Sequence, residues 1–284
     1  MHVSKLHHVT KSVTLCDVNT TRQVGAPELA DSLLARGIAS ATTSELAEML
    51  GVPADQVRRR LHAPARRGEW VTPAQGLWIP VPPEYRLWGA PEGIELVDLL
   101  MRHLDLDYYV GWLSAAAIHG ASHQAPQVFQ VATSRHVRDR QVGRTRFQFL
   151  MRRASATVPT IARPTRSGTA QVSSREVTML DVAADLDVAG GIDNAATVVI
   201  ELAEDGVDEA ELANLTSAFP AAAGRRIGWL LEELAGHDPL DALNAAVVGR
   251  VIEPSWLDPS GPRTGSLARR WHLRVNHEID EEAS

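Results

Sequence analysis

The stretch from Ala41 to Pro83 constrains the fold more than any other part of the chain, because it carries signals for two helices and a hairpin in close order. Thr42 and Glu45 have the spacing of a capping box, in which each side chain satisfies the other residue's backbone N–H. A helix over Ser44–Leu50 follows, and Gly51 is suited to end it in the left-handed conformation. The pattern therefore predicts a short, capped helix that ends in a tight turn.

A second helix is predicted to begin at Pro53, because the missing N–H of proline costs nothing at a helix start. Val57, Leu61 and Ala65 recur at helical spacing and are expected to face the core. Pro64 removes a backbone hydrogen bond late in this helix and should end or kink it.

A hairpin is predicted next, with strands at Glu69–Thr72 and Leu77–Pro80 and a four-residue turn at 73–76 between them. A helix over Glu28–Arg36, closed by Gly37, is expected to precede all of these elements. This order predicts a winged helix-turn-helix, a fold whose second helix lies in the major groove of DNA.

The polar side of the second helix carries side chains suited to DNA. Arg and Gln form bidentate contacts with guanine and adenine, each worth about 1–3 kcal/mol of base discrimination. The alternative is a solvated arginine face on an ordinary three-helix unit. We expect DNA contacts from Thr42, Ser44, Gln56, Arg58, Arg59, Arg60, His62, Arg66, Arg67 and Gln75.

Length and composition limit the class of protein. The 284 residues allow roughly two domains, and 44% of them are hydrophobic, which is enough for real cores. No run approaches the ~20 apolar residues of a membrane span, and no signal-peptide pattern is visible. Cys16 is the one cysteine, which excludes an intramolecular disulfide and a thiolate metal cluster. We therefore expect a cytoplasmic protein without membrane contact.

The prolines and glycines that interrupt the apolar pattern divide the chain into four predicted parts: a loose lead-in at 1–26, the winged helix at 27–83, a linker at 84–92 and a C-terminal domain at 93–284. The prolines around the linker favour extended backbone, so a stiff spacer is expected. The C-terminal domain is predicted to be a mixed α/β unit rich in helices, and the fold class is therefore α+β.

Apolar spacing predicts the elements of this C-terminal domain. A helix is expected from Gly93, and a nearly buried helix over Tyr108–Gly120. A final strand over Arg270–Asn276 is expected to close the sheet that begins near Gln127. The other predicted strands are Gln127–Thr133, Thr145–Met151 and Thr169–Ser173, and the other predicted helices are Ser174–Asp185, Ala195–Ala203, Asp208–Ser217, Gly224–Ala235 and Leu240–Val248.

The charges of the chain are polarised. The formal net charge is −7, but residues 131–175 carry ten Arg and one acid, Asp139, whereas residues 176–262 carry 17 acids and three Arg. Clustering rather than net charge decides local affinity for nucleic acid. The basic stretch either contacts nucleic acid or an acidic partner, or its arginines pair with the acids of the helices that follow.

The sequence gives only weak support for a catalytic or metal centre. His119 and His123 could share a metal, but no third ligand or His-Glu-x-x-His motif accompanies them. Ser114, His119 and Asp107 suggest a triad, but a Gly-x-Ser-x-Gly elbow is missing, and Gly190-Gly191 lacks the Lys of a phosphate loop. Asp181, Asp185 and Asp187 are more typical of a solvated helix face than of a metal site. We expect no enzyme activity, no metal and no cofactor.

The tryptophans are expected to serve packing. Trp112, Trp229, Trp256 and Trp271 lie among apolar neighbours, which favours the core over base stacking. Trp78 and Trp88 lie in the predicted wing and linker, where they could pack the winged helix against the second domain.

Five segments, taken in order, resemble one known family. They comprise the Thr-Pro-Ala-x-Gly-Leu wing and its proline-rich exit, a block that begins Tyr-Tyr-Val-Gly-Trp-Leu-Ser, a Val-Gly-Arg turn, a block Arg-Arg-x-Gly-Trp-Leu-Leu-Glu, and a closing Arg-Trp-His-Leu-Arg-Val-Asn. In this sequence they are Thr72–Gly89, Tyr108–Val131, Val142–Arg144, Arg225–Glu232 and Arg270–Asn276. In this order they resemble the AbiEi family of antitoxins from type IV toxin–antitoxin systems, over about residues 40–278.

The resemblance implies a function. Members of the family pair an N-terminal winged helix, which binds inverted repeats in the promoter of its own operon and represses it, with a C-terminal antitoxin domain. That domain counters a co-encoded nucleotidyltransferase toxin, in many members without a stable complex, in systems of phage defence. The antitoxic role would fall on Leu113–Gln127 and Arg225–Glu232. Pro64 departs from the family pattern, in which an aliphatic residue continues the helix.

The resemblance also assigns DNA reading, to Gln56, Arg58, Arg59, Arg60, Arg66 and Arg67. The partners implied are the double-stranded DNA of the promoter and the toxin. A different function stays open from the residues themselves: a DNA-localised enzyme or RNA-directed effector that uses the basic 131–175 region.

Overall fold

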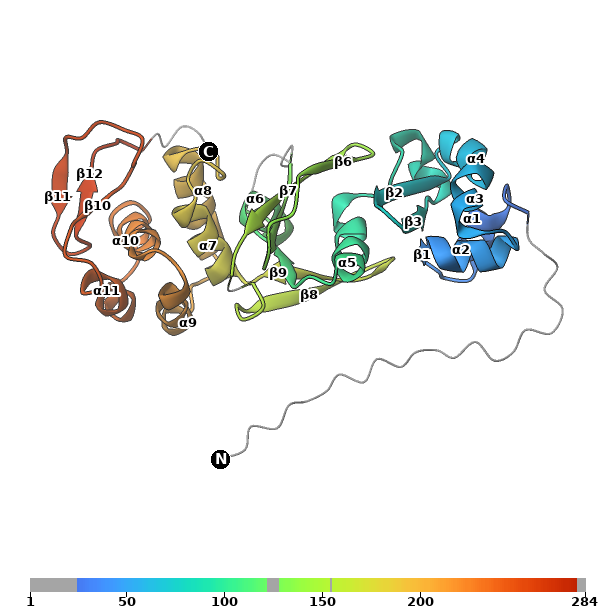
Figure 1. Ribbon diagram of the computed structural model, residues 1–284. Coiled ribbons are helices and arrows are strands. Elements are labelled where there is room, and N and C mark those ends of the chain that lie inside the picture. The colour runs from blue at the N-terminus through green and yellow to red at the C-terminus, as the bar shows by residue number, and fades with distance from the viewer. Residues whose placement is uncertain (1–24, 122–127, 154, 280–284) are drawn as a thin grey trace, which may run out of the picture.

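The computed structural model describes residues 25–121, 128–153 and 155–279. Almost all of the expected lead-in at 1–26 therefore lies outside the described residues. The elements form an elongated row, with helices α1–α4 at one end, a six-stranded sheet in the middle and helices α7–α11 with a small sheet at the other end (Figure 1). Three hydrophobic clusters follow one another along this row. Among the described residues no helix is long and apolar enough to cross a membrane.

Residues 25–81, here called the N-terminal unit, fold around the first cluster. Leu33, Leu46, Val57 and Leu61 are completely buried there. The three strands are antiparallel and lie in the order β1-β3-β2. The elements are α1 (Leu29–Ala35), β1 (Ala41–Thr42), α2 (Thr43–Leu50), α3 (Ala54–Arg60), α4 (His62–Arg66), β2 (Trp70–Ala74) and β3 (Leu77–Pro80).

The capping box is formed as predicted. The Thr42 hydroxyl accepts from the Glu45 N–H at 3.3 Å, and the Glu45 carboxylate accepts from the Thr42 N–H at 2.6 Å. Gly51 ends α2 with φ 62°, in the left-handed region that glycine adopts without strain.

Pro64 breaks the predicted second helix. Its missing N–H leaves the Arg60 carbonyl without an intrahelical partner, and its ring crowds that same carbonyl. Accordingly α3 ends at Arg60 and α4 begins at His62. The predicted kink is confirmed, and it falls at Leu61, one turn before the proline.

The hairpin differs from its prediction. Strand β2 continues to Ala74, with a register irregularity between Val71 and Ala74, so the four-residue turn is wrong and only Gln75 and Gly76 form the turn. β2 is an edge strand, where the missing N–H of Pro73 is tolerated. The short strand β1, which was not predicted, pairs with the other side of β3.

Strand β3 is buried on both faces. Leu77 and Ile79 belong to the second cluster, together with the helix that follows. Trp78 points the other way, packs edge to face on Trp70 and donates from Nε1 to Thr43 Oγ1 at 3.0 Å. Trp78 thus belongs to the core of the N-terminal unit, and the apolar contact with α5 is made by Leu77 and Ile79.

The extended spacer expected at 84–92 is also wrong. Pro83–Trp88 forms the 3₁₀ helix η1, and α5 (Gly93–Leu104) begins after the short connection 89–92. Trp88 packs against Tyr85 and lies under the guanidinium of Arg144 at 5.6 Å, so Trp88 does contact the turn that precedes β7. The segment is thus a packed connection rather than a spacer.

The middle sheet has the strand order β6-β7-β5-β4-β9-β8. The single helix predicted at 108–120 is wrong: the first residues form β4, and only the rest is helical. The expected strand start at Gln127 lies outside the described residues, and β6 and β8 were not predicted. The elements are β4 (Tyr108–Val110), α6 (Trp112–His119), β5 (Phe129–Thr133), β6 (Arg140–Val142), β7 (Thr145–Met151), β8 (Thr160–Thr165) and β9 (Gly168–Ser173).

The two faces of this sheet contribute to different cores. Tyr108, Val110 and Val131 pack toward α5 in the second cluster, whereas Tyr109 and Ala132 pack toward the helices beyond in the third. This is the alternation of side chains in a strand that is covered on both sides. The sheet therefore separates two cores, as β3 does.

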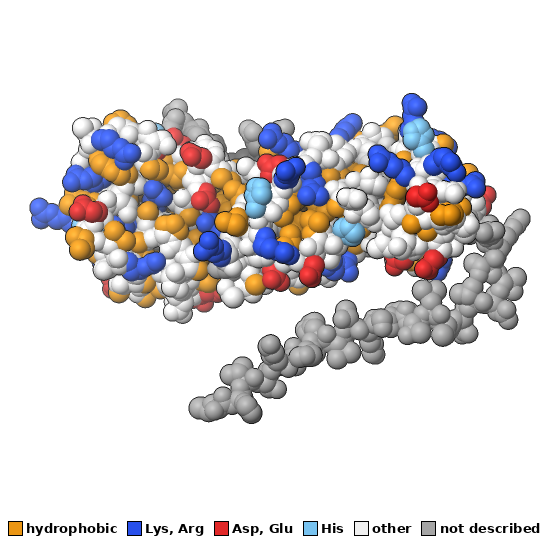
Figure 2. All heavy atoms as spheres, in the orientation of Figure 1, with side chains coloured by type: hydrophobic (Ala, Val, Ile, Leu, Met, Phe, Trp, Pro, Cys, Tyr) orange, Lys and Arg blue, Asp and Glu red, His pale blue; other side chains and the backbone are white. Residues whose placement is uncertain are grey.

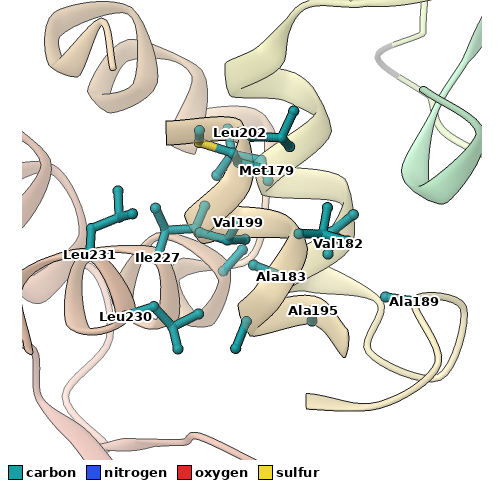
Figure 3. Close-up of a cluster of buried hydrophobic side chains, with 14 of the residues drawn as sticks. Met179, Val182, Ala183, Ala189, Ala195, Val199, Leu202, Ile227, Leu230 and Leu231 are labelled. Atoms are coloured by element: carbon teal, nitrogen blue, oxygen red, sulfur yellow. The ribbon is translucent and has the colours of Figure 1, made fainter. Parts of the chain in front are cut away.

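The third cluster fills the space between α7, α8 and α10 (Figure 3). Each predicted helix is found within a few residues of its expected bounds, except that the fourth ends in a π-helical turn, η3. The elements are α7 (Arg175–Ala184), α8 (Ile192–Ala203), α9 (Glu209–Leu215), η2 (Thr216–Ala218), α10 (Ala221–Trp229), η3 (Leu230–Leu234) and α11 (Asp241–Val248).

The expectation that the C-terminal strand closes the middle sheet is wrong. β12 (Leu273–Val275) lies between β10 (Ser255–Trp256) and β11 (Ser266–Ala268) in a separate three-stranded sheet. The fully buried Trp271 ring lies against Gly228 of α10, which holds the start of this strand beside the helices and away from the middle sheet.

The contact between α10 and Trp271 predicts a large effect of Gly228→Ala. A Cβ at position 228 would come 2.1 Å from the Trp271 ring, so the ring or the helix must move. Overpacking of this kind costs about 1–3 kcal/mol of unfolding free energy. Urea denaturation should show this loss, whereas Gly249→Ala, where a Cβ would meet nothing within 4 Å, should stay within about 0.5 kcal/mol of the parent. Equal midpoints for both variants would contradict the packing.

Candidate nucleic-acid interface

Exposed arginines gather on α3 and α4. Val57 and Leu61 bury one side of these helices, so Arg58, Arg59 and Arg60 in the last turn of α3 face solvent. Figure 2 shows Lys and Arg side chains over this end of the molecule. Guanidinium groups presented by a helix suit phosphates and the guanine edge in a major groove.

The arginines differ in how they are engaged. Arg67 forms a two-point ion pair with the mostly buried Glu69, with N–O distances of 2.6 and 3.2 Å. This hydrogen bonding raises the pKa of Arg67 and ties its side chain down. Arg59 donates to the Gln56 side chain at 3.1 Å. Within the described ranges, Arg58, Arg60 and Arg66 have no carboxylate partner.

The remaining predicted contact residues are distributed over β1, α2, α4 and the hairpin turn. Thr42 is exposed, but its hydroxyl serves the capping box, and Ser44 is exposed on the first turn of α2. His62 opens α4 and is separated from α3 by the break at Leu61. Gln75 lies at the hairpin turn, where its carbonyl accepts from His103 Nε2 at 2.9 Å. The polar side of the predicted second helix is therefore divided between α3, with Gln56 and Arg59, and α4, with His62 and Arg66.

A cleft of about 560 Å³ lies between α3, the β2–β3 hairpin and the segment before β6. One wall carries Arg58, and the other carries Arg138 and Arg140. Arg140 donates to the Pro73 carbonyl at 2.8 Å and lies over the Phe149 ring. Sequence reasoning found the basic stretch but missed this cleft, because the contact joins residues 67 positions apart. The lining residues are Thr43, Ala54, Arg58, Thr72, Pro73, Ala74, Gln75, Gly76, Trp78, Arg138, Asp139 and Arg140.

The arginines of the 131–175 stretch have mixed roles. Arg152 and Arg175 pair with acids of the following helices, as one alternative predicted, and Arg166 pairs with Glu84 on η1. Three more donate to backbone carbonyls and so serve the fold: Arg135, Arg140 and Arg163. The stretch is therefore not a uniform basic surface.

The described residues of the candidate histidine and serine centres have structural partners. His119 Nε2 donates to the Ser173 carbonyl at 2.8 Å, and burial lowers the pKa of His119. His123 lies outside the described residues. Ser114 Oγ contacts the Val128 carbonyl and the Gln130 N–H, so Ser114 and His119 bind different partners, and Asp107 is exposed.

The three aspartates in α7 and just after it do not form the solvated face that was expected. Asp181 is completely buried and accepts from the Tyr109 hydroxyl at 3.2 Å and from Arg152 at 3.1 Å. Asp185 accepts from Trp112 Nε1 at 2.9 Å and also pairs with Arg152. These groups join the middle sheet to α7. Asp187 alone of the three is exposed.

The Arg-Arg block of α10 is also used internally. Arg225 is fully buried and donates to the carbonyls of Val248, Val251 and Glu253, and Arg226 donates to those of Ala183, Trp256 and Leu257. Burial lowers the pKa of Arg226 to about 10. Both guanidinium groups thus anchor the C-terminal loops rather than face a partner.

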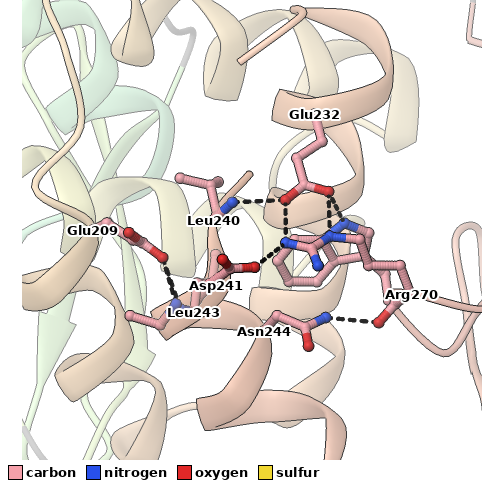
Figure 4. A network of polar contacts seen from close by, with 9 residues as sticks. Glu209, Glu232, Leu240, Asp241, Leu243, Asn244 and Arg270 are labelled. Atoms are coloured by element: carbon pink, nitrogen blue, oxygen red, sulfur yellow. Dashed lines mark hydrogen bonds and ion pairs between the residues drawn. The ribbon is translucent and has the colours of Figure 1, made fainter. Parts of the chain in front are cut away.

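Glu232 also holds the C-terminal segment, through hydrogen bonds to Arg270 and its neighbours (Figure 4). It accepts from Arg270 at 2.8 and 2.9 Å, from Trp271 Nε1 at 2.9 Å and from the Leu240 N–H at 2.7 Å. Burial by itself would raise the pKa of Glu232, but these hydrogen bonds outweigh it and the pKa is lowered. The charged residues of the Arg225–Glu232 block therefore have a structural explanation.

These features define an α+β protein with an arginine-rich end and a helical body. Comparison with known proteins points to one family. Residues 109–233, from β4 into η3, match the model of the AbiEi antitoxin C-terminal domain. This match supports an antitoxin of the AbiEi family, which is not a family of enzymes. The predicted resemblance is confirmed for this range. The predicted wing and C-terminal segments lie beyond the matched residues.

A solved structure shares the fold. The crystal structure of the RV2827C protein from Mycobacterium tuberculosis is similar to this chain with a TM-score of 0.63, over 90% of this chain and 92% of that one, at 18% sequence identity. At this identity the likeness concerns the fold alone. No curated protein matches the chain.

The buried carboxyl of Asp181 predicts a specific pH dependence. Burial raises its pKa from 3.8 to about 7, although Arg152 acts in the opposite direction. The folded state then binds the proton more tightly than the unfolded state, so this contribution to stability is full below about pH 4 and is lost as the pH rises toward 7. Asp181→Asn removes the titration. The unfolding free energy of the parent relative to this variant should therefore fall between pH 4 and 7, and a difference that stays constant or grows over this range would contradict it.

Proposed function

We propose that this chain is an antitoxin of a type IV toxin–antitoxin system that also represses its own operon. In this proposal, residues 27–83 are a winged helix-turn-helix that binds inverted repeats in the promoter. Residues 93–284 form the antitoxin domain, which counters a nucleotidyltransferase toxin, and η1 with its flanking residues connects the two. The protein acts in the cytoplasm and without a catalytic centre of its own.

The observation that carries the DNA-binding part is the arrangement of the N-terminal unit. Helix α2, the turn at Gly51, helix α3 and the β2–β3 hairpin follow one another as in winged helices, with α3 presenting its arginines to solvent. An ordinary three-helix unit has no need of a hairpin beside such a helix. Arg67, held by Glu69, supports the start of the hairpin in this proposal and does not read DNA.

The antitoxin part is supported by the family match over residues 109–233. The alternative, an enzyme or RNA-directed effector localised by its winged helix, has weaker support because six arginines of the 131–175 stretch are engaged by carboxylates or carbonyls. The gene beside this one distinguishes the two: an adjacent nucleotidyltransferase gene favours the antitoxin.

Specific binding to DNA tests the autoregulatory part. In a gel shift with its own upstream region, the protein should retard the duplex specifically, and the triple variant Gln56→Ala/Arg59→Ala/Arg60→Ala should lose this specificity by at least tenfold, because each bidentate base contact is worth about 1–3 kcal/mol. Arg36→Ala, an exposed arginine at the end of α1, is the matched control and should bind as the parent does. Equal, sequence-independent binding by parent and triple variant would refute the assignment of α3.

The two activities should be separable. The residues changed in the triple variant lie outside the matched antitoxin domain, so this variant should still rescue cells that express the neighbouring toxin while it fails to repress a promoter–reporter fusion. Growth and reporter signal are measured in the same cells, with the toxin and the variant expressed from foreign promoters. Loss of rescue by a variant that is folded and present at the parent level would show that α3 also takes part in neutralisation.

A further inference from the structure

We propose that the cleft between α3, the β2–β3 hairpin and residues 138–140 seats a phosphate of the DNA backbone, so that the middle sheet adds a contact of its own to the DNA complex. This inference rests on the proposed DNA-binding function and extends it. It assigns a role to Arg138, which lies outside the N-terminal unit, in the basic 131–175 stretch, and which is not among the residues named from the sequence as DNA contacts.

The walls of the cleft are held in fixed relation. Arg140 donates to the Pro73 carbonyl at 2.8 Å, and His103 donates to the Gln75 carbonyl at 2.9 Å, so the hairpin is tied to the segment before β6 and to α5. Leu77 and Ile79 add the apolar contact beneath. The segment that carries Arg138 is therefore held against the hairpin, and Arg138 lines the same cleft as Arg58 of α3.

The charge of the cleft suits an anion. Arg58 on α3 and Arg138 on the other wall are both exposed, and neither has a carboxylate partner within the described part of the chain. Asp139 is the acid of the lining, and its Oδ1 accepts from the Phe149 N–H at 3.0 Å, on the β7 side. Thr72, exposed on β2, adds a hydroxyl donor. The lining thus carries a net positive charge, and hydrogen-bond donors approach the cleft from two sides.

The position of the cleft favours a contact with the DNA backbone rather than with the bases. In a winged-helix complex the second helix reads the groove, and the flanking elements contact phosphates. Arg138 belongs to such a flanking element, and a guanidinium fork matches two phosphate oxygens. A contact of this kind carries no sequence information. It strengthens binding to operator and to unrelated DNA alike, and it makes that binding more sensitive to salt.

The test is a salt titration of DNA affinity by fluorescence anisotropy, with labelled operator and scrambled duplexes. Arg138→Ala should weaken binding to both duplexes several-fold and reduce the log–log salt slope by about 0.9, because the variant neutralises one phosphate fewer. Arg153→Ala is the matched control: it is an exposed arginine of the same basic stretch, beyond the far end of β7. Thermal unfolding of both variants confirms that each is folded.

The outcomes separate this inference from the function on which it rests. If the parent prefers its operator and Arg138→Ala keeps the slope and affinity of Arg153→Ala, the phosphate seat is refuted and the proposed function stands. A selective loss on the operator alone would also refute it, because it would mean base reading. If the parent shows no preference for its operator, both proposals fall.

Discussion

Strand β3 is the constraint on which the arrangement of the molecule depends. It is four residues long, and its side chains are buried on both faces: Leu77 and Ile79 in the core with α5, and Trp78 in the core of the N-terminal unit. A strand in this situation cannot move relative to either core without exposing apolar surface, at about 25 cal/mol per Å². The N-terminal unit is thereby fixed to the middle sheet, although a proline-rich connection separates them in sequence.

The same principle recurs at the next boundary. The middle sheet has Tyr108 and Val110 on one side and Tyr109 on the other, and the Asp181–Arg152 contact ties it to α7. Buried guanidinium groups then hold the C-terminal loops through their carbonyls. Polar groups buried in this way stabilise a fold only when they are satisfied, so the removal of one partner is costly. The molecule is thus a row of hydrophobic cores in which neighbouring cores share a strand or a sheet. A DNA-binding N-terminal unit would therefore have a fixed orientation relative to the rest of the chain.

Local signals in the sequence predicted local structure well. The capping box at Thr42, the left-handed Gly51 and the kink caused by Pro64 act within a few residues, and all three are found. The family resemblance was carried by long segments, and the matched residues 109–233 bear it out. The arginines of α3 could be selected because Val57 and Leu61 define the buried side of the helix.

Long-range pairing could not be predicted in the same way. A strand over Arg270–Asn276 fits any sheet edge, and its real partners follow from where Trp271 packs. Pro82 and Pro83 favour extended backbone by themselves, yet proline also suits the first turn of a helix, and here tertiary packing selects η1. Asp181 is typical of a solvated face until Arg152, 29 residues away, is placed beside it. The cleft with Arg138 depends on such a contact too.

Hydroxyl-radical footprinting of the upstream region by the full-length protein tests the central claim most directly. The account predicts two protected half-sites of an inverted repeat, each with protection of the backbone sugars on both sides of the groove that α3 enters. Protection that is uniform along the duplex, or that maps to no repeated sequence, would contradict an autoregulatory antitoxin that reads DNA through its N-terminal unit.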